Sequence, residues 1–139
     1  MNSKKALHVL FIDDDTIERM KFERTVGTLS FPVKITETQN GEDALALLKA
    51  VEELPHLVVL DLNMPRISGV EFLEILKNDE VLRYLPALIL TTSSNQKDLL
   101  DCYRIGVAGY LLKPLKYEVY EEKIRCALTY WNNVELIKT

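Results

Sequence analysis

Short apolar runs alternate with segments of helical periodicity along the whole chain, and this alternation constrains the fold more than any other feature. The run at residues 57–60 is wholly apolar, whereas the segment at 68–78 carries Val70, Phe72, Leu73 and Leu76 at helical spacing. Strands that alternate with helices are typical of a parallel sheet covered by helices on both faces. The sequence therefore predicts an α/β fold.

The pattern divides into five successive strand–helix units. The run at 57–60 is the most apolar and should be the central strand, whereas the run at 33–38 alternates apolar and polar residues and should lie nearer an edge. Gly106 should end the fourth helix, because glycine favours the C-terminal cap. We expect strands at residues 8–12, 33–38, 57–60, 87–90 and 110–112, and helices at about 16–28, 44–51, 68–78, 96–105 and 117–131.

Length and charge limit what the chain can do. With 139 residues and 47% hydrophobic content, it is long enough for one buried core and too short for two ordinary domains. We therefore expect residues 1–139 to form a single domain without an effector domain. The net charge of -4 argues against direct binding of nucleic acid, which needs a concentrated patch of Lys and Arg.

The N-terminal sequence indicates a cytoplasmic protein that does not cross a membrane. Residues 1–5 are polar, and the apolar run at 6–12 is far shorter than a signal-peptide core or a membrane span.

Cys102 and Cys126 fall in predicted helices, where a thiol is commonly a half-buried apolar residue. A disulfide or a cysteine metal site is the weaker interpretation.

Polar or charged residues follow four of the predicted strands directly. Asp13 and Asp14 follow the first strand, Asp61 the third, Thr91 the fourth and Lys113 the fifth. In an open parallel sheet, ligands bind at the carboxyl ends of the strands. We therefore expect three carboxylates, a hydroxyl and an ammonium to converge at one edge of the sheet.

Such a group of side chains suits the transfer of a phosphoryl group. Carboxylates brought close together favour a hard cation such as Mg²⁺, or Mn²⁺, which shares its preference for oxygen ligands. Mg²⁺ is usually held by one or two carboxylates together with phosphate oxygens, so the substrate should carry phosphate. Asp61 would attack phosphorus to give an acyl phosphate, while Lys113 neutralises the phosphoryl oxygens and Thr91 donates a hydrogen bond.

The chain resembles the receiver domains of response regulators, and the resemblance covers nearly its whole length. Each motif alone is weak, but four blocks in the right order, each at a strand end, form a strong combined signal. The blocks are Asp13-Asp14, Asp61-Leu62-Asn63-Met64-Pro65 with Gly69 downstream, Thr91, and Tyr110-Leu111-Leu112-Lys113-Pro114. The resemblance implies a flavodoxin-like (βα)5 fold, a doubly wound parallel five-stranded sheet with strand order 2-1-3-4-5.

The resemblance also implies roles for the residues of these motifs. Asp61 should be the phosphoacceptor. Asp14 should bind Mg²⁺ directly, Asp13 partly through water, and the backbone carbonyl of Asn63 should complete the protein's ligands together with Asp61. Lys113 should bind a phosphoryl oxygen, and the family pattern implies a cis peptide bond between Lys113 and Pro114.

In the family, a threonine and an aromatic residue form a switch. Here these residues are Thr91 and Tyr110, and phosphorylation would alter the surface of the fourth helix, fifth strand and fifth helix.

The implied partners are a sensor histidine kinase or phosphotransfer protein and an unknown downstream protein. Such a receiver is not a conventional enzyme but catalyses its own phosphorylation and dephosphorylation. The expected type is a single-domain, chemotaxis-like receiver, and the sequence at 130–134 is similar to receivers that partner phytochrome-type kinases.

The aromatic residues of the last two predicted helices admit two interpretations. Exposed Tyr and Trp are common at interaction surfaces, which would allow a homodimer or docking face. Their helical spacing fits inward packing equally well. The residues concerned are Tyr103, Tyr117, Tyr120, Tyr130 and Trp131.

Structural interpretations of the motif residues remain open beside the functional ones. Asp15 is best explained as a helix cap, and Ser94 or Asn95 should cap the fourth helix. Asp61 with its following Pro65 would also fit an ordinary turn. Lysines are usually solvated, so Lys113 stands out only because it precedes a proline beside the acidic edge.

Three other functions compete with the receiver. A haloacid-dehalogenase-type phosphatase also uses an aspartyl nucleophile and Mg²⁺, but its nucleophile would lie in the first acidic motif, and Ile17 departs from that signature. A pseudo-receiver that only docks partners leaves the acidic, Thr and Lys set unexplained. A flavodoxin-like or dinucleotide-binding protein would need a glycine-rich phosphate loop after the first strand, where this chain has Asp13 to Asp15.

Overall fold

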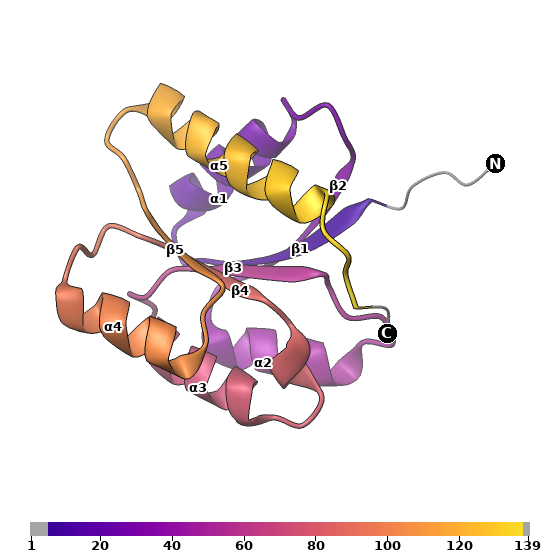
Figure 1. The fold of residues 1–139 in the computed structure, drawn as a ribbon, viewed down its shortest axis with the longest axis vertical. Helices are drawn as coiled ribbons and strands as arrows, with labels where there is room; N and C mark the ends of the chain where they lie inside the picture. Colours follow the sequence, from indigo (N-terminus) through magenta and orange to yellow (C-terminus); the bar gives the residue numbers. More distant parts are fainter. Residues whose placement is uncertain (1–5, 138–139) are drawn as a thin grey trace.

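The computed structural model describes residues 6–137 and shows one parallel sheet with helices on both faces (Figure 1). In the described part of the chain, no helix is both long enough and apolar enough to span a membrane. The strands are β1 (Leu7–Ile12), β2 (Val33–Thr38), β3 (Leu57–Leu60), β4 (Ala87–Thr91) and β5 (Gly109–Leu112). The helices are α1 (Thr16–Val26), α2 (Gly41–Ala50), α3 (Gly69–Asn78), the 3₁₀ turn η1 (Leu82–Tyr84), α4 (Gln96–Ile105) and α5 (Tyr117–Asn132).

The strand order is β2-β1-β3-β4-β5, and every pairing is parallel. The predicted fold class and strand order are therefore confirmed. Strand β3 is central and all four of its residues are buried, whereas β2 is an edge strand whose residues are only partly buried or exposed. The apolar run and the alternating run thus predicted the positions of these two strands correctly.

Two hydrophobic cores lie on opposite faces of the sheet. Because successive strand residues point to opposite faces, Leu10 and Val58 join one core while Val9 and Leu57 join the other. The first core is covered by α2, α3 and α4, and the second by α1 and α5, as Figure 1 shows. Because every strand pairing is parallel, the carboxyl ends of the strands lie together at one edge of the sheet.

The loops at this edge begin helices with side-chain caps. Asp15 accepts from the Ile17 N–H and caps α1, and Asn95 accepts from the Lys97 N–H and caps α4, as predicted. At the other end of α4, Gly106 has φ 123°, a conformation that glycine adopts without strain. Helix α1 ends at Val26, two residues earlier than expected, and the turn η1 was not predicted.

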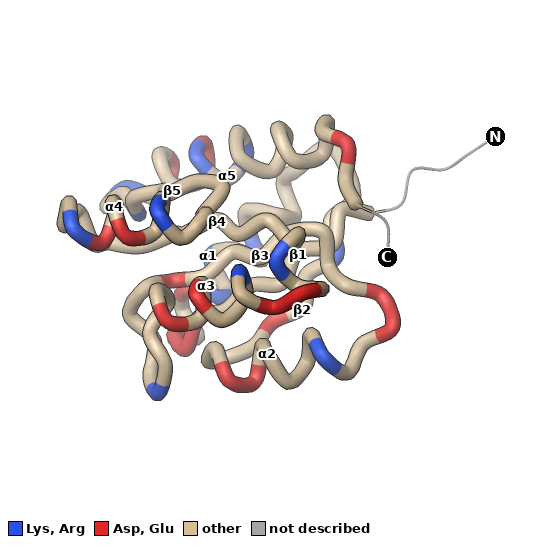
Figure 2. Tube along the Cα trace, turned by 60° about the horizontal axis from the view of Figure 1, so that its bottom comes forward, with Lys and Arg blue, Asp and Glu red and all other residues tan. Residues whose placement is uncertain are grey.

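Charged residues of both signs are neighbours on the outer helices (Figure 2). On α4, Asp101 pairs with Lys97 at 2.9 Å and with Arg104 at 3.4 Å. On α5, Arg125 pairs with Glu122 at 3.0 Å and with Glu121 at 3.6 Å. Exposed pairs of this kind stabilise a protein little, so the fold depends mainly on the two cores.

Candidate functional site

The register of the two central strands brings Asp13 and Asp61 together. Ile12 of β1 pairs with Leu60 of β3, so the next residue on each strand is one of the two aspartates. The Asp61 N–H donates to the Ile12 carbonyl at 3.4 Å, which continues the strand pairing to the edge. The two carboxylates therefore project from adjacent strands at the same height.

Lys113 reaches these carboxylates from the far side of β4. Its backbone N–H donates to the Thr91 carbonyl at 2.8 Å, which fixes it just beyond β5. Its Nζ donates to Asp61 Oδ2 at 3.1 Å and to Asp13 Oδ2 at 3.3 Å. The side chain is only 8% exposed, so the ion pairs are largely shielded from water.

The pKa of Lys113 reflects this arrangement. Burial alone would lower the pKa of its ammonium, because it disfavours the charged form. The neighbouring carboxylates of Asp61, Asp13 and Glu18 outweigh burial and raise the pKa to about 12. Lys113 is therefore a permanent cation beside Asp61.

Asp13 is the most buried carboxylate of the site, with 2% of its surface exposed. Burial raises the pKa of Asp13 above its ordinary value, although the Asp15 N–H and Lys113 act in the opposite direction. The Asp15 N–H donates to Asp13 Oδ1 at 2.9 Å, so both carboxylate oxygens have a partner. A buried carboxylate held in this way favours a nearby cation.

Asp14 and Asn63 lie at the solvent side of the edge. Both are exposed, and within residues 6–137 the Asp14 side chain makes no hydrogen bond or ion pair. The Asn63 N–H donates to Asp61 Oδ1 at 3.3 Å, so the loop after β3 folds back toward the carboxylate. Asp14 is thus accessible to a ligand from solvent, whereas Asp13 and Asp61 are joined through Lys113.

The donor set fits a hard cation only when other ligands take part. Among the residues that the structure describes, no three His, Cys, Asp or Glu side chains are arranged to hold a metal ion. Mg²⁺ typically takes one or two protein carboxylates and completes its shell with water and phosphate oxygens. The adjacent carboxylates of Asp13 and Asp61, with Asp14 at the solvent side, match that requirement in chemistry and in openness.

Thr91 and Tyr110 meet at the loop between β4 and α4. Thr91 is fully buried, and its Oγ1 accepts from the Ser93 N–H at 3.3 Å. The Tyr110 hydroxyl donates to the carbonyl of the same Ser93 at 2.9 Å. The two residues expected to form a switch therefore both make hydrogen bonds to the backbone of Ser93.

The expected cis peptide bond before Pro114 is wrong. In the described part of the chain, all peptide bonds are trans, including the bond between Lys113 and Pro114. Proline makes the cis form accessible but leaves trans favoured by about 0.5–1 kcal/mol. The trans bond already allows Lys113 to contact both Asp13 and Asp61, so the ion pairs do not require the cis form.

Glu18 is a charged residue of the site that the sequence did not indicate. It lies in the first turn of α1, and its Oε1 is 3.0 Å from Lys113 Nζ. An acidic residue in a first helical turn is common because it suits the helix dipole, so the sequence alone gave no reason to single it out.

Gly69 lets α3 begin directly under the phosphoacceptor candidate. Its N–H donates to the Leu62 carbonyl at 2.8 Å. A Cβ atom at this position would lie 2.6 Å from the Asp61 carbonyl oxygen and 2.7 Å from Leu62 Cα. Only glycine fits between the helix and the loop, so Gly69 contributes to the position of Asp61.

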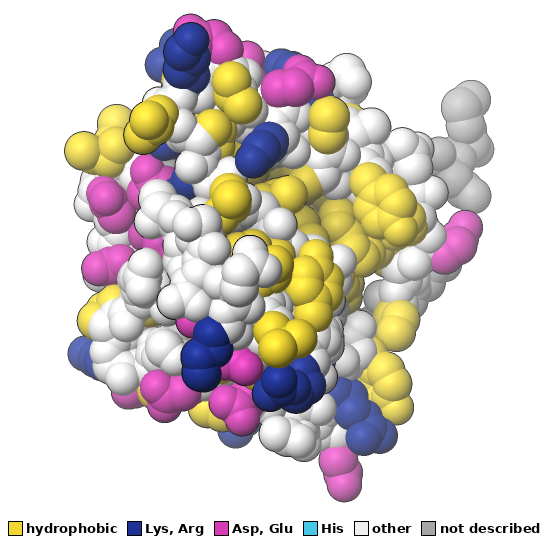
Figure 3. Space-filling view, turned by 60° about the vertical axis from the view of Figure 1, so that its left-hand side comes forward, with side chains coloured by type: hydrophobic (Ala, Val, Ile, Leu, Met, Phe, Trp, Pro, Cys, Tyr) yellow, Lys and Arg dark blue, Asp and Glu magenta, His cyan; other side chains and the backbone are white. Residues whose placement is uncertain are grey.

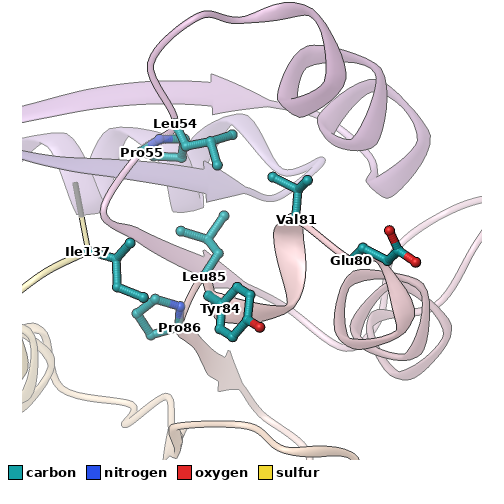
Figure 4. Close-up of a pocket in the computed structure, with 8 residues that line it drawn as sticks. All are labelled: Leu54, Pro55, Glu80, Val81, Tyr84, Leu85, Pro86 and Ile137. Carbon is teal, nitrogen blue, oxygen red and sulfur yellow. The ribbon is translucent and has the colours of Figure 1, made fainter. Parts of the chain in front are cut away.

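An apolar hollow of about 300 Å³ lies at the opposite edge of the sheet (Figure 4). Pro55 and Pro86, which line it, precede β3 and β4, whereas Asp61 and Thr91 lie at the other ends of these strands. Tyr84 and Ile137 also line the hollow. Apart from Glu80 and the Tyr84 hydroxyl its lining is apolar, and it is separate from the candidate site.

Comparison with known proteins agrees with the fold and the motifs. The sequence model of the family described as "Response regulator receiver domain" matches residues 9–125. The probable methanogenesis regulatory protein FilR2 of Methanothrix harundinacea is 34% identical over 127 residues, which cover 88% of this chain and 82% of that protein.

Two solved structures are closely similar in fold. The phosphorylated cyanobacterial phytochrome response regulator RcpA superposes with a TM-score of 0.89 at 23% identity, covering 95% of this chain and 99% of that one. The Mn²⁺-bound form of response regulator Rcp1 superposes with a TM-score of 0.86 at 25% identity, covering 94% of this chain and 98% of that one. At these identities the likeness concerns mainly the fold.

Proposed function

The chain belongs to the response regulator receiver domain family, and on this basis we propose that it is a two-component phosphorylation switch whose phosphoacceptor is Asp61. The observation that supports this assignment best is the contact of Lys113 Nζ with Asp61 Oδ2 at 3.1 Å, at the carboxyl edge of the sheet. The side chain of Asp61 remains 14% exposed, so a phosphoryl donor can reach it from solvent.

The proposed reaction transfers a phosphoryl group from a phosphohistidine. An Asp61 carboxylate oxygen attacks phosphorus, the P–N bond breaks, and its electron pair returns to the imidazole nitrogen of the donor. Lys113 then binds a phosphoryl oxygen, and the buried Thr91 hydroxyl donates to another. The acyl phosphate is later hydrolysed by water, which restores the Asp61 carboxylate.

A divalent cation should assist this transfer. The carboxylates of Asp13, Asp14 and Asp61 and the backbone carbonyl of Asn63 would hold Mg²⁺ or Mn²⁺. The response regulator Rcp1, whose fold is similar, has been solved in a Mn²⁺-bound form. The bound cation would neutralise charge on the transferred phosphoryl group. Asp13 and Asp61 are suited to this task because their carboxylates lie side by side at the ends of adjacent strands.

The output of the switch should come from the surface of α4, β5 and α5. Hydrophobic side chains gather on the face of the molecule that Figure 3 shows. Thr91 and Tyr110 both hold the loop that leads into α4, so a shift of either residue on phosphorylation would change this surface. The exposed large hydrophobic residues of these three elements are Leu100, Tyr103, Leu112, Val119 and Tyr130.

A protein partner fits this surface. Of the aromatic residues considered for a docking face, Tyr103 and Tyr130 are exposed, whereas Tyr120 is buried in the core. We assign the input to a sensor histidine kinase or phosphotransfer protein and the output to a second protein, both in the cytoplasm. A homodimer would use the same hydrophobic surface.

The competing functions have less support. A haloacid-dehalogenase-type enzyme would use the first aspartate, Asp13, as its nucleophile, but Asp13 is only 2% exposed, whereas the side chain of Asp61 is 14% exposed. A docking pseudo-receiver gives no account of the ion pairs among Asp13, Asp61 and Lys113. The family match likewise favours the receiver.

Intact mass after incubation with acetyl phosphate tests the proposal. The wild type should gain a single phosphoryl adduct in the presence of Mg²⁺ and none in EDTA, and Asp61→Asn should gain none. Asp101→Asn is a matched control, because it makes the same change on the surface of α4 and should gain the adduct. A folded wild type without any adduct would reject the proposal in favour of a docking pseudo-receiver.

A further inference from the structure

Three carboxylates surround the ammonium of Lys113, and the nearest belongs to Glu18. The Nζ atom lies 3.0 Å from Glu18 Oε1, 3.1 Å from Asp61 Oδ2 and 3.3 Å from Asp13 Oδ2. Asp13 and Asp61 come from the sheet, whereas Glu18 comes from α1. Lys113 donates hydrogen bonds to Asp61 and Asp13, whereas its contact with Glu18 is an ion pair without hydrogen-bond geometry. One cation is thus shared among three anions.

Glu18 is largely enclosed on α1, on the side of the sheet where α1 packs against α5. Its side chain is 17% exposed, and its Oε2 pairs with Lys21 at 3.3 Å. Lys21 Nζ in turn lies 4.5 Å from the centre of the Tyr120 ring. Tyr120 is fully buried, and its hydroxyl has no hydrogen-bond partner within residues 6–137. Glu18 therefore acts on Lys113 in a poorly hydrated corner, where a charge is weakly screened.

Phosphorylation requires Lys113 to change partners. When Asp61 becomes an acyl phosphate, its negative charge moves outward onto the phosphoryl oxygens, and Lys113 must follow that charge. Asp13 and Glu18 keep their own negative charges and continue to attract the ammonium. Asp13 is a proposed cation ligand, and the cation would draw its charge away from Lys113, so Glu18 would remain as the main competitor.

We propose that Glu18 is a positioning residue. From its place on α1 it attracts the Lys113 ammonium, and it thereby weakens the interaction of Lys113 with the phosphoryl group on Asp61. This inference rests on the proposed function, because it assigns Glu18 to the same reaction. The carboxylate acts through Lys113 and does not touch the phosphoryl group. Its charge also repels the incoming phosphoryl group, which acts in the same direction as the competition for Lys113.

The equilibrium affinity for beryllofluoride in the presence of Mg²⁺ measures this interaction, because beryllofluoride on the Asp61 carboxylate stands in for the phosphoryl group. Glu18→Gln removes the charge and keeps the shape, and isothermal titration calorimetry should show binding about three- to tenfold tighter than wild type. Glu18→Asp keeps the charge and should return the affinity toward that of the wild type. A folding defect would weaken beryllofluoride binding, so tighter binding by Glu18→Gln could not result from a folding defect.

Lys21→Met provides a second and opposite test. Without Lys21, the Glu18 carboxylate has only Lys113 as a cationic partner and should hold it more firmly. Beryllofluoride binding should then weaken by about threefold or more. Glu118→Gln is the matched control for Glu18→Gln, because it makes the same change in the exposed first turn of α5, and it should bind beryllofluoride as the wild type does.

The outcomes separate this inference from the proposed function. A wild type that binds beryllofluoride at Asp61, together with unchanged affinity in Glu18→Gln and Lys21→Met, would overturn the role of Glu18 and leave the proposed function intact. A wild type that neither binds beryllofluoride nor gains a phosphoryl adduct would overturn both. Equal tightening in Glu18→Gln and Glu118→Gln would show a general charge effect and reject the specific role.

Discussion

Lys113 and Asp61 follow strands that are not neighbours, since β4 lies between β5 and β3, yet Lys113 Nζ reaches within 3.1 Å of Asp61 Oδ2. The lysine side chain is long enough to cross the end of one strand. A side chain, and not a loop, therefore links the ends of β5 and β3. A single substitution of that side chain can break the ion pairs.

Substitution of Lys113 should affect both stability and phosphorylation. Lys113→Met leaves the buried Asp13 and Asp61 carboxylates without their shared cation, which should lower the free energy of unfolding by about 3 kcal/mol. It should also slow adduct formation from acetyl phosphate at least about tenfold, since the positive charge that binds the phosphoryl oxygens is lost. Urea unfolding and intact mass measure the two effects.

Lys123→Met serves as its control. Lys123 lies on α5 and donates to the Leu112 carbonyl at 2.9 Å, outside the acidic site. This variant should change the free energy of unfolding by no more than about 0.5 kcal/mol and should leave the adduct rate unchanged. Equal effects of the two substitutions would contradict the role assigned to Lys113.

Mg²⁺ should stabilise the folded protein. A cation that binds only the folded state raises the free energy of unfolding by about 2.7 kcal/mol at a concentration one hundred times its dissociation constant. The thermal midpoint should rise with added Mg²⁺ and return after EDTA. Asp14→Asn should reduce this rise, because Asp14 is the exposed carboxylate of the proposed ligands. A full rise in that variant would remove Asp14 from the ligand set.

Gly69→Ala should disturb the site through the backbone. The added Cβ would lie 2.6 Å from the Asp61 carbonyl oxygen, so either α3 or the loop must move. We expect a loss of about 1–3 kcal/mol in the free energy of unfolding, together with a slower adduct rate.

Gly27→Ala is a suitable comparison for Gly69→Ala. Gly27 has φ -64°, and the nearest atom to an added Cβ is the Arg24 carbonyl oxygen at 3.4 Å. This substitution should be neutral or should stabilise the protein by about 0.4–1 kcal/mol. If Gly69→Ala were as stable as Gly27→Ala, the loop after β3 could move to accommodate the added Cβ atom at little cost, which would contradict this prediction.

Stability should fall on mild acidification because of His8. Burial lowers the pKa of His8 below its ordinary value of 6.5, and the positive charge of Lys34 adds to the effect. Its neutral ring lies 2.7 Å from Thr36 Oγ1 through Nε2. Because the folded pKa lies below the unfolded one, the contribution is complete above pH 6.5 and is lost as the pH falls through the folded pKa.

Urea unfolding between pH 8 and pH 5 measures this effect. The wild type should lose stability over the lower part of that range, and His8→Gln should show a shallower dependence on pH. An identical dependence in both proteins would mean that His8 does not titrate in this way.

Much of the site could be predicted because it depends on strand ends. Asp13, Asp61, Thr91 and Lys113 each follow an apolar run that the sequence predicts to be a strand. Parallel strands carry their carboxyl ends to one edge, so the approach of Asp13, Asp61 and Lys113 needed no knowledge of the loops.

The features that were missed depend on tertiary packing. Glu18 looks like any acidic residue of a first helical turn until the fold brings α1 within reach of the Lys113 side chain. The trans bond before Pro114 is a choice between two forms of similar energy, which local sequence does not decide. The short turn η1 depends on Asp79, whose carboxylate accepts from two backbone N–H groups, those of Val81 and Leu82.

The parallel arrangement also determines where the chain can be joined to other proteins. Strand β1 begins at Leu7, and Ile137 lies against Pro55 and Pro86 at the amino ends of β3 and β4. Both limits of the described chain thus lie at the edge opposite Asp61. A fluorescent reporter or a further domain attached through either limit would point away from the phosphorylation edge and leave the approach of a kinase unobstructed.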